Sequence, residues 1–176
     1  GWMARFDLAM LEHCLTHLQQ QPRPLAISLS AATLLEPGSR ARLLALLREH
    51  SQHAALLTLE IDEHQLPEAK EMERLCLAIR GTGFQVALQH FGGRFSLIGN
   101  LTHLGLAYLK IDGSYIRAID QESDKRLFIE AIYRASNSID LPLIAEMVET
   151  QGELDVLKEL GIQGAMGRLI GAPEPW

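Results

Sequence analysis

Cysteines, long apolar runs and clustered basic residues are all scarce in this sequence, and each scarcity excludes a class of protein. The two cysteines, Cys14 and Cys76, lie in helix-like segments without metal-ligand spacing, so neither a disulfide framework nor a zinc site is expected. No apolar run approaches the roughly 20 residues that span a bilayer. Charged residues also interrupt the N-terminal segment, where a signal peptide has its apolar stretch. These features predict a cytoplasmic location.

The formal net charge of -6 is spread along the chain and is not gathered into a patch. Proteins that hold nucleic acid by its backbone need clustered Lys and Arg, so DNA and RNA are not expected partners. A single small anionic ligand remains open. With 176 residues, of which 47% are hydrophobic, the chain is long enough for one domain with a sizeable core.

Apolar spacing predicts helices that alternate with strands. The predicted helices span 6–18, 39–49, 68–80, 95–101, 124–140 and 152–160. The predicted strands span 25–29, 55–61, 85–88, 108–111 and 141–145, with a last strand near Gly164 before a loop that contains Pro173 and Pro175. Such alternation is typical of a parallel sheet with crossover helices.

Polar residues near the ends of the predicted strands favour a barrel over an open sheet. The residues expected at or near the carboxyl ends are Ser28, Glu60, Gln89, Lys110, Asp112, Glu146 and Gln163. In a TIM barrel these ends converge on one rim, whereas in an open sheet the outermost would lie too far apart. No glycine-rich dinucleotide fingerprint follows the first strand. We therefore expect an α/β, TIM-barrel-like fold, although six strand units are two short of a complete barrel.

One loop motif and three acidic motifs carry a family resemblance. The loop motif is VALQHFGGRFSLIGNL at 86–101, and the acidic motifs are LEIDE at 59–63, LKID at 109–112 and LIAEMVET at 143–150. In this order they resemble the EAL family of cyclic di-GMP phosphodiesterases. The resemblance covers essentially the whole chain and implies one EAL-like domain over 1–176. It also implies that the first strands of the barrel, with the Glu-Ala-Leu motif, lie upstream, so we expect an N-terminally truncated domain.

The resemblance assigns roles to five retained residues. It implies that Glu60 is a metal ligand, that Glu63 braces a loop, and that Lys110 lies near the attacking water. It further implies that Glu146 is a general base or metal ligand, and that Gln163 is the glutamine before the last barrel loop. Active members of the family hold two divalent metals with such residues and hydrolyse one phosphodiester of cyclic di-GMP.

Three positions depart from the family pattern. Ser28 stands where the family has a metal-binding asparagine, and Gln89 and His90 stand where it has consecutive aspartates. Hard divalent cations prefer oxygen ligands, above all carboxylates, so an amide and an imidazole are poor substitutes. We therefore expect no bound metal, no required cofactor and no functional catalytic residue at the retained positions.

The same substitutions favour binding of the ligand without metal. Cyclic di-GMP carries two phosphates, and a neutral Gln89 and His90 remove the repulsion that two unshielded aspartates would exert. Arg94 adds a phosphate contact and Phe95 a surface for stacking on guanine, although Phe95 is equally well explained as core packing. Asp112 fits either the ligand site or a loop-holding role. For His90, a hydrogen-bonded loop position is the commoner alternative to a direct phosphate contact.

The resemblance thus implies a catalytically inactive EAL domain that acts as a cyclic di-GMP receptor. Receptor-type members are bacterial inner-membrane proteins in which HAMP and degenerate GGDEF segments precede a cytoplasmic EAL domain. Ligand binding favours their homodimerisation through EAL domains and recruits a periplasmic protease that controls adhesion and biofilm formation. The alternative is a low-activity, metal-dependent phosphodiesterase that uses Glu60, Lys110 and Glu146. A third interpretation is a scaffold for protein partners that binds no nucleotide.

Overall fold

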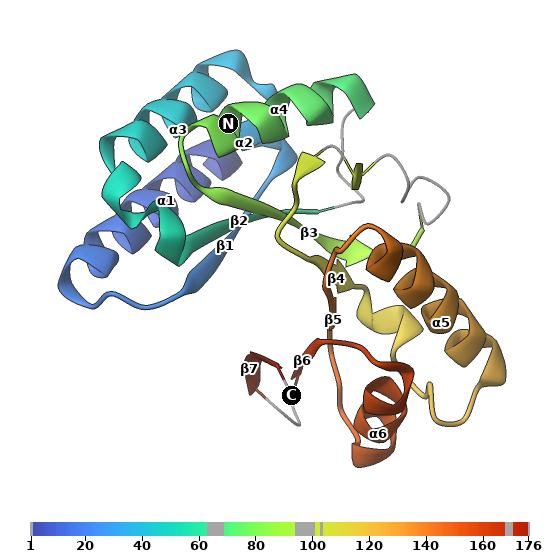
Figure 1. The fold of residues 1–176 in the computed structure, drawn as a ribbon. Helices are drawn as coiled ribbons and strands as arrows, with labels where there is room; N and C mark the ends of the chain where they lie inside the picture. Colours follow the sequence, from blue (N-terminus) through green and yellow to red (C-terminus); the bar gives the residue numbers. More distant parts are fainter. Residues whose placement is uncertain (1, 63–68, 94–100, 103, 168–170, 176) are drawn as a thin grey trace. The chain divides into compact units, whose positions relative to one another are not determined.

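The computed structural model describes residues 2–62, 69–93, 101–102, 104–167 and 171–175. The chain divides into two compact units, Gly1–Ala87 and Leu88–Trp176, which are described one at a time. Figure 1 shows the order of helices and strands along the chain. Among the described residues, no helix is both long and apolar enough to cross a bilayer.

The first unit pairs two parallel strands and packs helices against them. Its elements are α1 (Trp2–Gln20), β1 (Leu25–Leu29), α2 (Ala31–Leu35), α3 (Pro37–Glu49), η1 (Ser51–Leu56), β2 (Leu57–Asp62), α4 (Ala69–Gly81) and the start of β3 (Gln85–Phe91). The helix α1 buries Ala4, Asp7, Leu11, Leu15 and Leu18, a spacing of three or four residues that places them on one face. This face contacts α2 and α3, and α3 also contacts α4.

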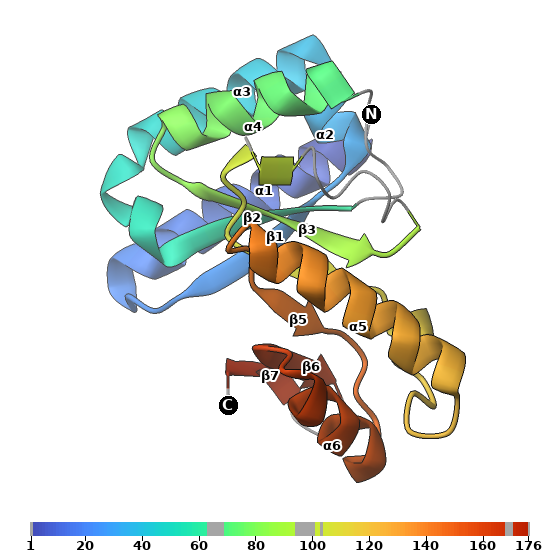
Figure 2. The same cartoon turned by 45° about the vertical axis from the view of Figure 1, so that its right-hand side comes forward.

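The second unit is built around the end of β3 and the strands that follow it. Its other elements are β4 (Leu109–Ile111), η4 (Gly113–Tyr115), α5 (Ser123–Ser138), β5 (Leu143–Ala145), α6 (Gln151–Leu160), β6 (Gly164–Gly167) and β7 (Gly171–Pro175). The strands β3 to β6 pair in sequence order and in parallel, whereas β7 pairs antiparallel with β6. Figure 2 shows α5 and α6, which contact each other, beside these strands.

The predicted alternation of helices and parallel strands is confirmed, with several corrected boundaries. The strand predicted at 55–61 begins at Leu57 because η1 extends to Leu56, and the strand predicted at 85–88 continues to Phe91. The short helix α2 was not predicted, since five residues are too few to show a helical period. Residues 95–100 of the helix predicted at 95–101 lie outside the described residues.

The prediction of a loop around Pro173 and Pro175 is wrong, because both residues belong to β7. Proline lacks the N–H that a residue within a sheet donates to a neighbouring strand, so prolines usually indicate a loop. Proline is tolerated on edge strands, where one row of N–H groups needs no partner in the sheet. The antiparallel pairing of β7 with β6 fits this exception.

Cys76 is fully buried in α4, which leads to a prediction about its reactivity. Burial raises the pKa of the Cys76 thiol to about 11, against which the nearby Arg80 acts only weakly. Since the thiolate is the reactive form, Cys76 should resist a thiol reagent at pH 8 until the protein unfolds. Cys14, which is only half-buried, is the internal control and should react first. Equal labelling rates for the two thiols in the folded protein would contradict this prediction.

Candidate functional site

In the first unit, Ser28 and Glu60 lie side by side on neighbouring strands. They are partners in the parallel register of β1 and β2, and each is followed by only one or two further residues of its strand. The side chain of Glu60 is buried, with the residue 3% exposed, whereas Ser28 is exposed. The sequence prediction that these two residues meet near the carboxyl ends of adjacent strands is confirmed.

A buried carboxylate holds the turn that follows Ser28. Asp7 of α1 accepts a hydrogen bond from Ser30 N at 2.7 Å and another from Thr33 Oγ1 at 2.6 Å. Ser30 is the N-cap of α2, so this carboxylate fixes both the cap and the first turn of the helix. Sequence analysis did not single out Asp7. The available signal was an acidic residue four positions before Leu11 in a predicted helix, a spacing that places it on the same face.

Replacing Asp7 by alanine should therefore destabilise the protein. Two hydrogen bonds to a charged acceptor are lost and two partly buried donors are left unpaired, for a cost of about 3 kcal/mol. Urea unfolding followed by circular dichroism measures this loss. Glu12→Ala is the matched control, because it removes an exposed carboxylate from the same helix and should change stability little. Equal losses for the two variants would show that the Asp7 contacts contribute nothing.

In the second unit, a carboxylate, an imidazole and an ammonium group converge. Glu146 follows β5 directly and is 6% exposed, and Lys110 in the middle of β4 is also 6% exposed. His90 Nε2 lies 3.6 Å from Glu146 Oε2, and the His90 side chain is 40% exposed. His90 and Lys110 thus both lie near Glu146, and Gln89 precedes His90 in β3. The role of these residues as a ligand site stays a prediction.

The protonation of Glu146 depends on opposing effects. Burial raises the pKa of its carboxyl, and this effect outweighs the lowering by the nearby His90, by Lys110 and by a hydrogen bond that the His90 backbone N–H donates. Asp112 raises the same pKa slightly. A carboxylate with a raised pKa retains its proton more readily, which reduces the negative charge that the site presents to an anionic ligand.

The backbone has a left-handed conformation at His90 and at Met147, the residue after Glu146. His90 has φ +56° and Met147, next to Glu146, has φ +57°. For residues other than glycine, the left-handed region costs roughly 1–2 kcal/mol in conformational free energy. A hydrogen bond to β6 holds the backbone just after Met147, because Val148 N donates to Met166 O at 2.9 Å. The backbone near the end of β3 and just after β5 is thus strained on either side of Glu146.

Asp112 has the loop-holding role that sequence analysis left open for it. Its Oδ1 accepts from Ser114 N at 3.3 Å and caps η4, and its backbone N donates to Phe91 O at 3.0 Å. These bonds join the end of β3 to the turn after β4. The ligand-binding role of Asp112 stays a prediction.

The predicted position of Gln163 is wrong. Gln163 precedes β6, so it lies at the amino end of that strand and not at the carboxyl end. Its Oε1 accepts from the backbone N of Leu143, the first residue of β5, at 3.0 Å. In a parallel sheet the amino ends lie at the opposite edge from Glu146. We therefore leave Gln163 out of the proposed ligand site. Arg94, Phe95 and Glu63 lie outside the described residues, and their roles stay predictions.

The side chains of the second unit fit a hard divalent cation poorly. Gln89 offers an amide and His90 an imidazole, and Glu146 already faces His90 and Lys110. Mg²⁺ and Ca²⁺ are held by clustered oxygen ligands, chiefly carboxylates. Within the ranges that the structure describes, no group of three or more His, Cys, Asp or Glu side chains is placed to hold a metal ion.

Curated relatives include known and probable enzymes. The chain is 29% identical over 178 residues to the probable cyclic di-GMP phosphodiesterase PdeA of Escherichia coli, an alignment that covers 98% of this chain and 24% of PdeA. The chain thus spans about a quarter of the length of this relative.

Two solved structures are similar to the fold. One is Vibrio cholerae LapD, an S helix-GGDEF-EAL protein bound to c-di-GMP, with a TM-score of 0.85 and 26% identity over 94% of this chain and 42% of LapD. The other is the PaMucR phosphodiesterase in its c-di-GMP complex, with a TM-score of 0.87 and 25% identity over 99% of this chain and 79% of the other. These matches confirm the predicted TIM-barrel-like α/β fold. The EAL domain profile matches residues 1–173, and the chain therefore belongs to the EAL domain family.

Proposed function

We propose that this chain is a cyclic di-GMP receptor domain without phosphodiesterase activity. The observation that carries the proposal is the position of His90. Its imidazole lies 3.6 Å from Glu146, at a position where the family resemblance expects an aspartate. Gln89 stands at the other expected aspartate. The end of β3 thus presents two uncharged or cationic groups to a ligand that carries two phosphates.

The electrostatics of the site support binding of an anion. Lys110 is a buried ammonium group, and burial raises the pKa of the Glu146 carboxyl. Two like unit charges roughly 6 Å apart repel by about 3 kcal/mol at an effective dielectric of about 20, and each aspartate of the family pattern would add a repulsion of this order toward a phosphate. The proposed ligand-binding residues are Gln89, His90, Lys110 and Glu146 in the second unit and Ser28 and Glu60 in the first, together with Arg94 and Phe95.

The biological setting is proposed by analogy with LapD, whose printed description includes an S helix and a GGDEF domain before its EAL domain. By this analogy, the chain is the cytoplasmic part of a bacterial inner-membrane receptor that also has HAMP and GGDEF-like segments. Binding of cyclic di-GMP shifts the EAL domains toward a homodimer. The output is control of adhesion or biofilm formation through a periplasmic protease.

A slow metal-dependent phosphodiesterase is the second candidate function. Relatives such as PdeA are described as probable phosphodiesterases, and Glu60, Lys110 and Glu146 are all retained and buried. In this alternative the three residues would support hydrolysis with an altered metal. The two candidates differ in whether the nucleotide survives.

Calorimetric titration of cyclic di-GMP into the full-length protein in EDTA tests the proposal. The recovered nucleotide is then incubated with the protein and Mg²⁺ or Mn²⁺ and separated by chromatography. A receptor binds without metal and returns the nucleotide intact. Metal-dependent conversion to linear pGpG would establish the enzyme instead. The absence of both heat and conversion would overturn both functions and leave a scaffold for protein partners.

A further inference from the structure

We propose that Tyr115 is a positioning residue that fixes the end of β3, which carries Gln89 and His90, through contact of its ring with Gly92. The inference rests on the proposed function, because it assigns a determinant of ligand affinity to the same site. Tyr115 lies in η4, after the LKID motif, and belongs to none of the motifs that sequence analysis used.

The contact between Tyr115 and Gly92 leaves no room for a side chain on the loop. A β-carbon built on Gly92 would overlap Cε2 of Tyr115 and would lie 2.7 Å from Cδ2 and 2.9 Å from Cζ. These distances are far below van der Waals contact, so the ring lies directly against the glycine backbone. Gly92 is buried and comes two residues after His90.

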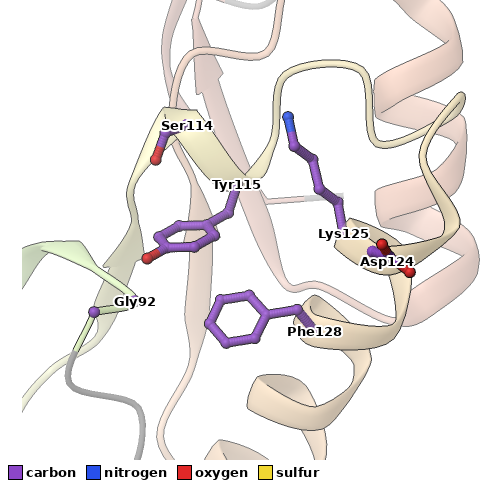
Figure 3. Close-up of a pocket in the computed structure, with 7 residues that line it drawn as sticks. Gly92, Ser114, Tyr115, Asp124, Lys125 and Phe128 are labelled. Carbon is purple, nitrogen blue, oxygen red and sulfur yellow. The ribbon is translucent and has the colours of Figure 1, made fainter.

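The ring itself is held from two sides. Its centroid lies 4.7 Å from that of Phe128 in α5, with an angle of 42° between the ring planes. Figure 3 shows the Tyr115 side chain between Gly92 and Phe128. In the backbone, Tyr115 N donates to Asp112 O at 3.0 Å, and Asp112 N donates to Phe91 O at 3.0 Å. The aromatic ring and the backbone of the turn thus both reach the segment just after His90.

A cavity lies beside the Tyr115 ring, so loss of the ring would leave the Gly92 segment free to move. It measures about 660 Å³ and is lined by Gly92, Gly93, Tyr115, Phe128 and the neighbouring start of α5. A smaller side chain at position 115 would leave open space against the loop, and the loop could relax into it. Because His90 lies only two residues before Gly92 and Gln89 only three, such relaxation would move the groups proposed to face the phosphates.

A second tyrosine provides a matched control. Tyr133, also in the second unit, packs against Gly161, where a built β-carbon would lie 3.0 Å from its Cζ. Tyr133→Leu therefore removes a ring from a glycine at the C-cap of α6, away from the β3 loop. Tyr115→Leu makes the same chemical change against Gly92, and Tyr115→Phe keeps the ring.

The experiment measures affinity for cyclic di-GMP in EDTA and the backbone NMR spectrum for each variant of the full-length protein. We expect Tyr115→Leu to weaken binding about tenfold, to remove the ring-current shift of the Gly92 Hα signals and to move the Gln89 and His90 amide signals. Tyr115→Phe and Tyr133→Leu should bind as the unmodified protein does. Since both leucine variants lose one packed ring, a general loss of stability would affect them alike.

Two results would overturn the inference. One is binding by Tyr115→Leu that equals that of Tyr133→Leu, and the other is unchanged Gln89 and His90 signals in Tyr115→Leu. Failure of the unmodified protein to bind cyclic di-GMP would instead refute the proposed function. In that case the NMR comparison of the two leucine variants still decides whether Tyr115 positions the loop.

Discussion

Replacing Gln89 and His90 together by aspartate should weaken metal-free binding of cyclic di-GMP by at least about a hundredfold. The change places two carboxylates at the end of β3, near Glu146, and removes the imidazole that lies 3.6 Å from its Oε2. Repulsion of about 3 kcal/mol for one charge pair roughly 6 Å apart corresponds to a hundredfold change in the dissociation constant, and the second aspartate adds to this effect. Titration calorimetry in EDTA measures it.

The control for this variant carries the same change of charge elsewhere. Gln121→Asp combined with Asn137→Asp alters two exposed residues of the second unit. Affinity should be nearly unchanged in this control, because exposed charges beyond a screening length of about 8 Å have little effect at physiological salt. Addition of Mn²⁺ should restore part of the affinity of the Gln89→Asp, His90→Asp variant. If the Gln89→Asp, His90→Asp variant binds as tightly as the unmodified protein in EDTA, the absence of charge at Gln89 and His90 is not what permits binding.

Glu153→Ala should cause a large loss of stability. The Glu153 carboxylate is 4% exposed and accepts from Ala118 N at 2.8 Å, Glu149 N at 2.9 Å and Thr150 N at 3.2 Å. Alanine leaves three backbone donors without this acceptor, at a cost of about 3–5 kcal/mol. For a chain of this size the thermal midpoint should fall on the order of 10 °C.

Two further variants separate the hydrogen bonds of Glu153 from its charge. Glu149→Ala removes an exposed carboxylate four residues earlier and should shift the midpoint little. Glu153→Gln keeps one acceptor oxygen but can turn an N–H toward Ala118 N, so it should fall between alanine and the unmodified protein. A midpoint for Glu153→Ala close to that of Glu149→Ala would mean that the turns after β4 and β5 are stable without this carboxylate.

Sequence reasoning located the part of the site that has strong local signals. Gln89, His90, Lys110 and Glu146 each end or follow a short apolar run, and these runs form the parallel strands β3, β4 and β5. In a parallel sheet the carboxyl ends of such strands lie along one edge, so their shared location followed from topology alone.

The misplaced residues belong to segments with weak or misleading patterns. Strand β6 is Gly-Ala-Met-Gly, which lacks the β-branched residues that mark a strand, and Gln163 was therefore assigned to the wrong end of it. Glu153 resembles a solvated acidic residue on a helix surface. Its one signal was the Thr150-x-x-Glu153 pattern, a capping box that the structure confirms. The contact of Tyr115 with Gly92 joins residues that no local pattern relates.

The buried carboxylates Asp7 and Glu153 accept hydrogen bonds from backbone N–H groups and, for Asp7, from a hydroxyl. Buried pairs of this kind are screened little by salt, in contrast to exposed ion pairs. Raising the ionic strength should therefore leave the turns after β1, β4 and β5 intact while it weakens the long-range attraction of the site for a dissolved anionic ligand. A fall in affinity with salt would then report the charge of the ligand and not a loosening of the loops that hold it.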